Sequence, residues 1–135
     1  MTLCARLMEA LKEKSFDAAL IHRPENMRYL TGYTGEGCVF VCGAETVIIT
    51  DFRYVEQASR QAPGLRVLST DAMHRENDRV LELTDGYAVR RLAVERDYLS
   101  YDCHEALRER LPFVELGALA SLPEELRLIK DADEV

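Results

Sequence analysis

Residues 26–35 read NMRYLTGYTG, and they combine a turn of helix with a loop rich in glycine and aromatic residues. Pro24, just before them, suits the first turn of a short helix because its φ is fixed near the helical value. Gly32, Gly35 and Gly37 then predict a tight loop with exposed backbone. The stretch therefore predicts a short helix that ends in a glycine loop leading into a strand.

A second informative stretch follows at residues 47–58, VIITDFRYVEQA. Its β-branched residues predict a strand, and Asp51 can then cap a helix that extends to about residue 62. Arg53 falls in the first turn of that helix, and Tyr54 is expected on its core side. Residues 37–42 are also β-branched and aromatic, so the two strands are expected to form a hairpin across a Gly-Ala-Glu turn.

Outward from these stretches, segments of strand and helix character alternate along the chain. Strands are expected at residues 18–21, 37–42, 46–50, 65–68, 92–94 and 114–116, and helices after Thr2, over 51–62, before Gly86 and from Ser100 or Asp102 to Leu111. This alternation predicts an α/β fold, a mixed β-sheet of about five or six strands with helices on both faces.

Composition excludes several classes of function. The chain has 135 residues, a formal net charge of −7 and no dense cluster of Lys and Arg, which disfavours a surface for nucleic acid or anionic membrane. The longest apolar runs are far too short to cross a bilayer, and no signal pattern opens the sequence. We expect a cytoplasmic protein whose four cysteines (Cys4, Cys38, Cys42 and Cys103) are reduced and buried.

No recognisable catalytic constellation appears in the chain. His22, His74 and His104 lie in separate segments, without the spacing of a metal-binding helix. Cys38 and Cys42 share one face of a strand, but no thiol or histidine lies near them in sequence, which disfavours a metal or redox role. The glycine-rich loop precedes a strand, so it lacks the helix N-terminus that binds phosphate.

The end of the chain carries two capping boxes. One spans residues 121–124 and predicts a short helix, and the other spans residues 131–134 and is followed only by Val135. A capping box begins a helix, and an isolated helix needs roughly 12–15 residues to be marginally stable. One interpretation is that residues 129–135 begin the first helix of a further domain, and the alternative is a frayed natural tail.

Taken together, these stretches resemble the N-terminal domain of the creatinase/prolidase/aminopeptidase P family of metallopeptidases. The matching segments are NMRYLTGYTG at 26–35, VIITDFRYVEQA at 47–58 and EELRLIKDADEV at 124–135. The sequence departs from many relatives at Ala93-Val94, where Gly and an aromatic residue precede the glutamate, and over residues 72–79. The resemblance implies a fold with a ribonuclease H-like motif, with residues 1–128 as the N-terminal domain and 129–135 as the start of a C-terminal catalytic domain.

In this family the second, pita-bread domain holds two divalent metal ions (Mn, Co or Zn) on two Asp, one His and two Glu. None of those positions is present here, so the resemblance implies no catalytic residue, no metal ligand and no peptidase activity in this chain. It further implies a homodimer, a C-terminal catalytic domain as partner, and a peptide substrate with proline at its second position. Nucleic acid and membrane are not expected as partners.

The resemblance also suggests which residues approach the substrate. Glu36 would meet its amino group, Arg53 its carboxylate, and Tyr33 begins the loop on which Glu36 lies. Structural roles are expected for six further residues, namely Asn26, Tyr29, Gly32, Gly35, Asp51 and Tyr54. The alternative for Glu36 and Arg53 is also structural, with Arg53 in a surface ion pair.

Three functions remain open from the sequence. The first is the non-catalytic N-terminal domain of an Xaa-Pro dipeptidase or aminopeptidase, which contributes to dimerisation and closes the active-site cleft. The second is the same domain of a creatinase-like amidinohydrolase. The third is a binding or dimerisation module attached to a pita-bread domain that has lost its metal ligands.

Overall fold

The protein is described by a computed structural model that covers residues 2–119. Two expectations lie outside these residues, the capping boxes at 121–124 and 131–134 and the domain boundary at 128/129. The helices are α1 (Leu3–Glu13), α2 (Pro24–Thr31), the 3₁₀ turn η1 (Phe52–Tyr54), α3 (Val55–Gln61), α4 (Glu76–Gly86) and α5 (Tyr101–Arg110). The strands are β1 (Ala18–Ile21), β2 (Cys38–Cys42), β3 (Thr46–Asp51), β4 (Arg66–Thr70), β5 (Arg91–Val94) and β6 (Glu115–Ala118).

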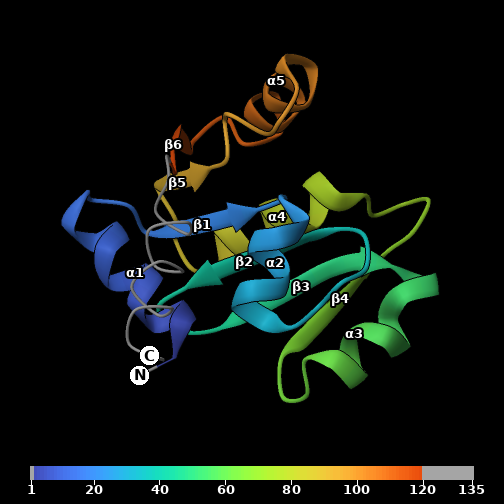
Figure 1. Ribbon diagram of the computed structural model, residues 1–135. Coiled ribbons are helices and arrows are strands. Elements are labelled where there is room, and N and C mark those ends of the chain that lie inside the picture. Colours follow the sequence, from blue (N-terminus) through green and yellow to red (C-terminus); the bar gives the residue numbers. More distant parts are fainter. Residues whose placement is uncertain (1, 120–135) are drawn as a thin grey trace.

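The strands form one mixed sheet of six, in the order β4-β3-β2-β1-β5-β6. β1, β2 and β3 are antiparallel neighbours, whereas β4 pairs parallel with β3, β5 with β1 and β6 with β5. Figure 1 shows α5 and β6 at one end of the sheet, and β4 with α3 at the other. The predicted mixed α/β sheet is confirmed.

Helices cover both faces of the sheet, as the alternation of side chains requires. On one face, α1, α2 and α3 pack on Ala19, Ile21 and Val39. On the other, α4 and α5 pack on Leu20 and Phe40. Because neighbouring residues of β1 and β2 serve opposite cores, all their side chains are buried.

Most capping residues identified in the sequence begin the helices that the structure shows. Thr2 accepts a bond from the Ala5 N–H, and Ser100 from the Cys103 N–H, so the predicted caps of α1 and α5 are confirmed. Asp51 also caps, but it begins the 3₁₀ turn η1 rather than the α-helix. The helix predicted over 51–62 is therefore divided into η1 and α3.

The four cysteines are free thiols, but they are not all buried as expected. Cys38 and Cys42 are buried on β2, Cys4 is half-buried on α1, and Cys103 is exposed on α5. The apolar pattern around Cys103 is too weak to turn it inward, since only Leu107 of α5 is fully buried.

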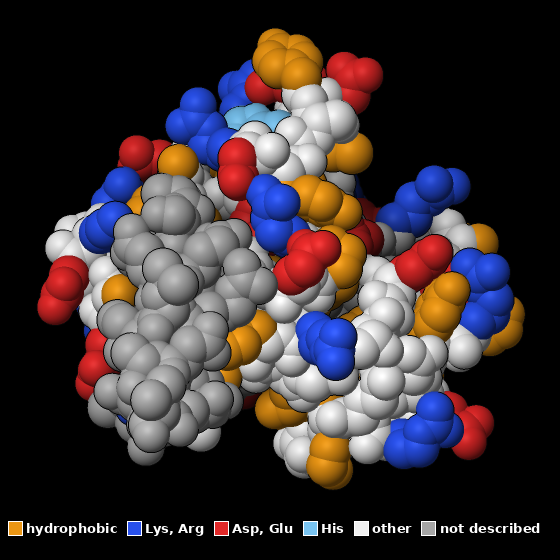
Figure 2. Space-filling view, viewed as in Figure 1, with side chains coloured by type: hydrophobic (Ala, Val, Ile, Leu, Met, Phe, Trp, Pro, Cys, Tyr) orange, Lys and Arg blue, Asp and Glu red, His pale blue; other side chains and the backbone are white. Residues whose placement is uncertain are grey.

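Charged side chains of both signs are interspersed over the face shown in Figure 2, without a wide basic area. Among the described residues, no helix is both long and apolar enough to span a membrane.

Gly37 is required where the loop enters β2. Its φ is +121°, and a Cβ there would lie 2.1 Å from the carbonyl oxygen of Ile49 on β3. Replacing Gly37 with Ala is expected to lower the free energy of unfolding by about 2–4 kcal/mol, because both the backbone conformation and the hairpin pairing would be strained. Urea unfolding of Gly37→Ala measures this loss. In the matched control Gly43→Ala, at the other end of β2, a Cβ meets nothing within 4 Å, and a loss as large as that of Gly37→Ala would contradict the explanation.

Candidate functional site

A buried carboxylate anchors the segment that the sequence singled out. Glu95 follows β5 directly and is only 1% exposed. Its Oε1 accepts the backbone N–H groups of His22 and Arg23, the latter at 2.7 Å, and its Oε2 accepts Asn26 Nδ2 at 2.6 Å. Arg23 is the N-cap of α2 and has no side-chain cap bond of its own, so Glu95 supplies the anion that the helix N-terminus favours.

Asn26 was expected to have a structural role, and its side chain binds the buried Glu95, 69 residues away. The glycine loop is held by Thr31, whose hydroxyl donates to the Met27 carbonyl and accepts the Tyr33 N–H. Tyr29 packs at the edge of the core as expected.

Gly32 ends α2 in the left-handed conformation, with φ +86°, and its N–H bonds to the Arg28 carbonyl. The next residue, Tyr33, turns into the core and is fully buried. Its hydroxyl lies 2.6 Å from the Glu36 carbonyl oxygen and 2.9 Å from Thr50 Oγ1. Burial raises the pKa of Tyr33, so the phenol stays neutral and can donate.

Tyr33 thus supports the loop from beneath and does not present its ring to a cleft. The fit is tight, since a Cβ on Gly35 would lie 2.4 Å from the Tyr33 hydroxyl oxygen. The expected structural role of Gly35 has this close approach as its physical reason.

Glu36 is exposed at the top of this loop, beside a cleft of about 470 Å³. The cleft is lined by the loop from Thr34 to Gly37, by His22 at one end, by Pro24 and Met27 of α2, and by Tyr54, Gln57 and Tyr98. The Arg23 guanidinium stacks over the Tyr98 ring at 5.1 Å and binds Asp97 at 2.8 Å, which fixes this wall of the cleft. The cleft has one carboxylate at its rim over largely apolar and aromatic walls.

Arg53 lies near the cleft but does not line it. Its side chain is 63% exposed, its Nε lies 3.0 Å from Asp51 Oδ1, and its guanidinium stacks on Tyr54. The Arg53 backbone N–H, and then its guanidinium, hold the pKa of Asp51 below its usual value. The surface ion pair that the sequence offered as the alternative role for Arg53 is therefore present, and Tyr54 is half-buried rather than fully in the core.

The structure brings together a second group of polar side chains, which the sequence did not predict. His22, Cys38 and Glu76 come from three separate segments, yet one ligand atom of each lies within 4.8 Å of the others. His22 Nε2 is 3.2 Å from Glu76 Oε2. A signal for two of them existed, since His22 follows β1 and Cys38 begins the antiparallel β2, but nothing in the sequence pointed to Glu76.

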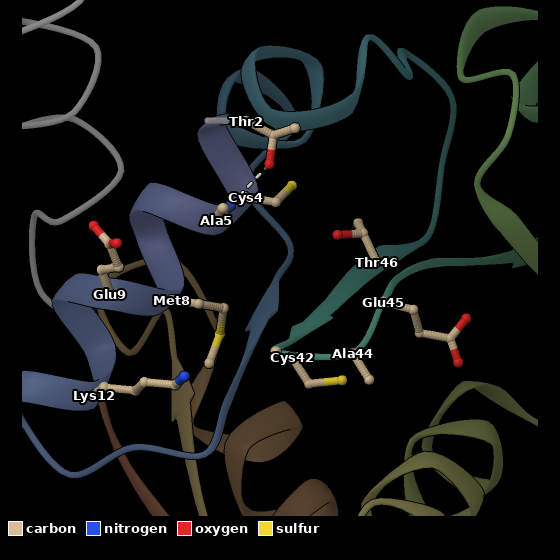
Figure 3. A pocket seen from close by; sticks show the side chains of 11 residues that line it. Thr2, Cys4, Ala5, Met8, Glu9, Lys12, Cys42, Ala44, Glu45 and Thr46 are labelled. Atoms are coloured by element: carbon tan, nitrogen blue, oxygen red, sulfur yellow. Dashed lines mark hydrogen bonds between the residues drawn. The ribbon is translucent and has the colours of Figure 1, made fainter.

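A second cavity, of about 350 Å³, lies between α1 and the β2–β3 turn (Figure 3). Cys4 and Met8 of α1 and Cys42 of β2 contribute its sulfur-containing walls. Glu45 points away from α1, and its carboxylate binds Arg66 at 3.0 Å and the Tyr87 hydroxyl. Glu9 and Lys12 also line it, but Glu45 is already engaged by Arg66 and Tyr87, so this cavity is a weaker candidate than the cleft beside Glu36.

The sequence and the fold of this chain are similar to those of known proteins. A family model described as the creatinase/prolidase N-terminal domain matches residues 4–129. The uncharacterized peptidase YqhT of Bacillus subtilis (strain 168) is 29% identical over 131 residues, which cover 96% of this chain and 36% of that protein. The chain thus spans about a third of the length of this curated relative.

Two solved structures are similar over nearly the whole chain. The N-terminal domain of the cytoplasmic peptidase PepQ from Mycobacterium tuberculosis H37Rv has a TM-score of 0.83 and 29% identity, covering 92% of this chain and 97% of that one. An Xaa-Pro dipeptidase from Bacillus anthracis has a TM-score of 0.85 and 33% identity, covering 93% of this chain and 35% of that one.

Replacing Glu95 with Gln tests its anchoring role. The amide can retain one acceptor, but its NH₂ group would face an N–H donor, so we expect a loss of at least about 3 kcal/mol in urea unfolding. Glu115→Gln is the control, because Glu115 is 69% exposed and only pairs with Arg91 at 3.4 Å. Its loss should stay within about 0.5 kcal/mol. Equal losses in the two variants would show that Glu95 is no special anchor.

Proposed function

This chain belongs to the creatinase/prolidase N-terminal domain family, and we propose that it serves as the non-catalytic N-terminal domain of an Xaa-Pro dipeptidase or aminopeptidase. The observation that carries the proposal is the family match over residues 4–129, together with 33% identity to the Xaa-Pro dipeptidase of B. anthracis. The chain covers 35% of that dipeptidase, which leaves ample length for a catalytic domain after residue 128.

The chemistry of the proposed peptidase would then lie in the remaining part of the protein. Two divalent ions activate a water molecule and stabilise the tetrahedral intermediate of amide hydrolysis. Within residues 2–119, one group of three ligating side chains comes together, at His22, Cys38 and Glu76, and three ligands are too few to hold a pair of ions. The proposal therefore assigns binding and positioning, not bond cleavage, to this chain.

The cleft beside Glu36 is the proposed contribution of this domain to the substrate site. Glu36 is exposed on a loop that Tyr33, Thr50 and Gly35 hold rigidly. Such a carboxylate can bind the free amino group of a peptide by a charge-assisted hydrogen bond. Arg53 can meet a substrate carboxylate, but it must first exchange its bond to Asp51.

We also propose that the full-length protein is a cytoplasmic homodimer in which this domain helps to close the active-site cleft. PepQ of M. tuberculosis, whose N-terminal domain is similar, is described as cytoplasmic. Phe52 of η1 and Phe113 after α5 are 73% and 88% exposed, so apolar surface is present that a second subunit or domain would cover.

The proposal that this domain has no peptidase activity of its own is tested by comparing the isolated chain with the full-length protein. We expect the 135-residue chain to hydrolyse no Xaa-Pro dipeptide when Mn²⁺ or Co²⁺ is added, whereas the full-length protein does. Measurement of released proline checks this. Robust metal-dependent hydrolysis by the pure chain would contradict the proposal.

The role of Glu36 is tested by Glu36→Gln in the full-length protein. Loss of the charge is expected to raise KM for an Xaa-Pro dipeptide about tenfold, the effect of one charge-assisted bond, with a smaller change in kcat. Glu56→Gln, at an exposed position of α3, is the matched control and should leave both constants unchanged. An unchanged KM in Glu36→Gln would remove Glu36 from the substrate site.

A further inference from the structure

His22, Cys38 and Glu76 meet at the end of the sheet where β1 finishes and β2 begins. In the antiparallel pair, Ile21 lies opposite Val39, so the next pair along the ladder is His22 and Cys38. Both belong to the face that α4 covers, and Glu76 is the first residue of α4. Three elements far apart in sequence therefore direct an imidazole, a thiol and a carboxylate to one point.

The distances suit a small tetrahedral ion. Nitrogen and oxygen ligands lie about 2.0–2.2 Å from Zn²⁺, which separates two of them by about 3.4 Å in a tetrahedral site. His22 Nε2 and Glu76 Oε2 are 3.2 Å apart, and the three ligand atoms all lie within 4.8 Å of one another.

Burial and access also fit a bound ion. Cys38 is fully buried, and the His22 and Glu76 side chains are 13% and 36% exposed. A cavity of about 140 Å³ lies against His22 and Glu76 and extends to Leu99 and Leu107. It offers a path for the ion and room for a water molecule as fourth ligand.

His22 Nε2, the nitrogen that faces Glu76, is the one that would bind the ion. Within the described part of the chain, His22 Nδ1 is buried without a hydrogen-bond partner, so packing alone leaves this imidazole incompletely satisfied. An aliphatic side chain at position 38 would serve the core without placing sulfur beside a carboxylate.

We propose that His22, Cys38 and Glu76 bind one zinc ion. On binding, the Cys38 S–H proton leaves to solvent and the thiolate forms the Zn–S bond, with no change of oxidation state. The ion balances the charges of one thiolate and one carboxylate. It ties β1, β2 and α4 together beneath the His22 end of the cleft.

The test uses the reduced, metal-free 135-residue chain with Zn²⁺ and Co²⁺ as probes. Calorimetric titration is expected to give one ion per chain and a rise in Tm. Co²⁺ should produce a thiolate-to-metal charge-transfer band together with the visible bands of a tetrahedral site. Absence of stoichiometric binding, or Co²⁺ spectra without thiolate character, would overturn the proposal.

Variants identify the ligands. Cys38→Ser and His22→Gln should each weaken Zn²⁺ binding by at least about 10- to 100-fold, the loss that even outer-shell partners cause. Cys42→Ser is the matched control, since Cys42 is a buried thiol on the same strand and the same face, and His74→Gln controls for surface histidine. Both should bind as the unmodified chain does.

Glu76→Gln serves as a third variant if Cys38→Ser fails to fold, because the Glu76 side chain is partly exposed and its replacement disturbs the core little. It should also lose binding and the rise in Tm with Zn²⁺. Retention of unmodified affinity in His22→Gln or Glu76→Gln, or its loss in Cys42→Ser, would rule out this ligand set.

Discussion

The position of the candidate site depends on one buried carboxylate. Glu95, at the end of β5, accepts the backbone N–H groups of His22 and Arg23 and the side chain of Asn26. A buried anion is costly unless its oxygens are bonded, and here both are, so the group is stable only when α2 begins at this point. The parallel pairing of β5 with β1 brings the two segments together. The pairing of β1 with β5, which are far apart in the sequence, therefore fixes the residue at which α2 begins.

The start of α2 in turn fixes the positions of the loop after it and of Glu36. α2 ends at Gly32, Tyr33 turns beneath the loop, and its hydroxyl joins the Glu36 carbonyl to Thr50 of β3. The loop that presents Glu36 is thus bonded to Thr50 of the sheet at one end and, through the Thr34 N–H, to Gln61 of α3 at the other. A preformed cleft wall of this kind suits a domain that positions a substrate whose bond is cleaved by another domain, because little ordering entropy is lost on binding.

Much of the fold was predictable because local and periodic signals agree. Helix ends are marked in the sequence by Thr2, Pro24, Gly32 and Ser100. Strands that are buried on both faces, such as β2, appear in the sequence as runs of apolar residues. The division of the helix after Asp51 was missed, since a capping residue does not distinguish a 3₁₀ turn from an α-helix. The bonds of Glu95 and the meeting of Glu76 with Cys38 were also beyond prediction. They depend on which strands and helices become neighbours, and sequence spacing carries no such information.

The anchoring role of Glu95 is tested most directly by amide hydrogen exchange of the unmodified chain, followed by NMR. The His22 and Arg23 N–H groups lie beyond the end of β1, and their acceptor is the Glu95 carboxylate. We expect these two amides to exchange as slowly as those within β1, because they open only when the Glu95 contact breaks. Exchange at the rate of an unstructured peptide, while β1 stays protected, would contradict the account.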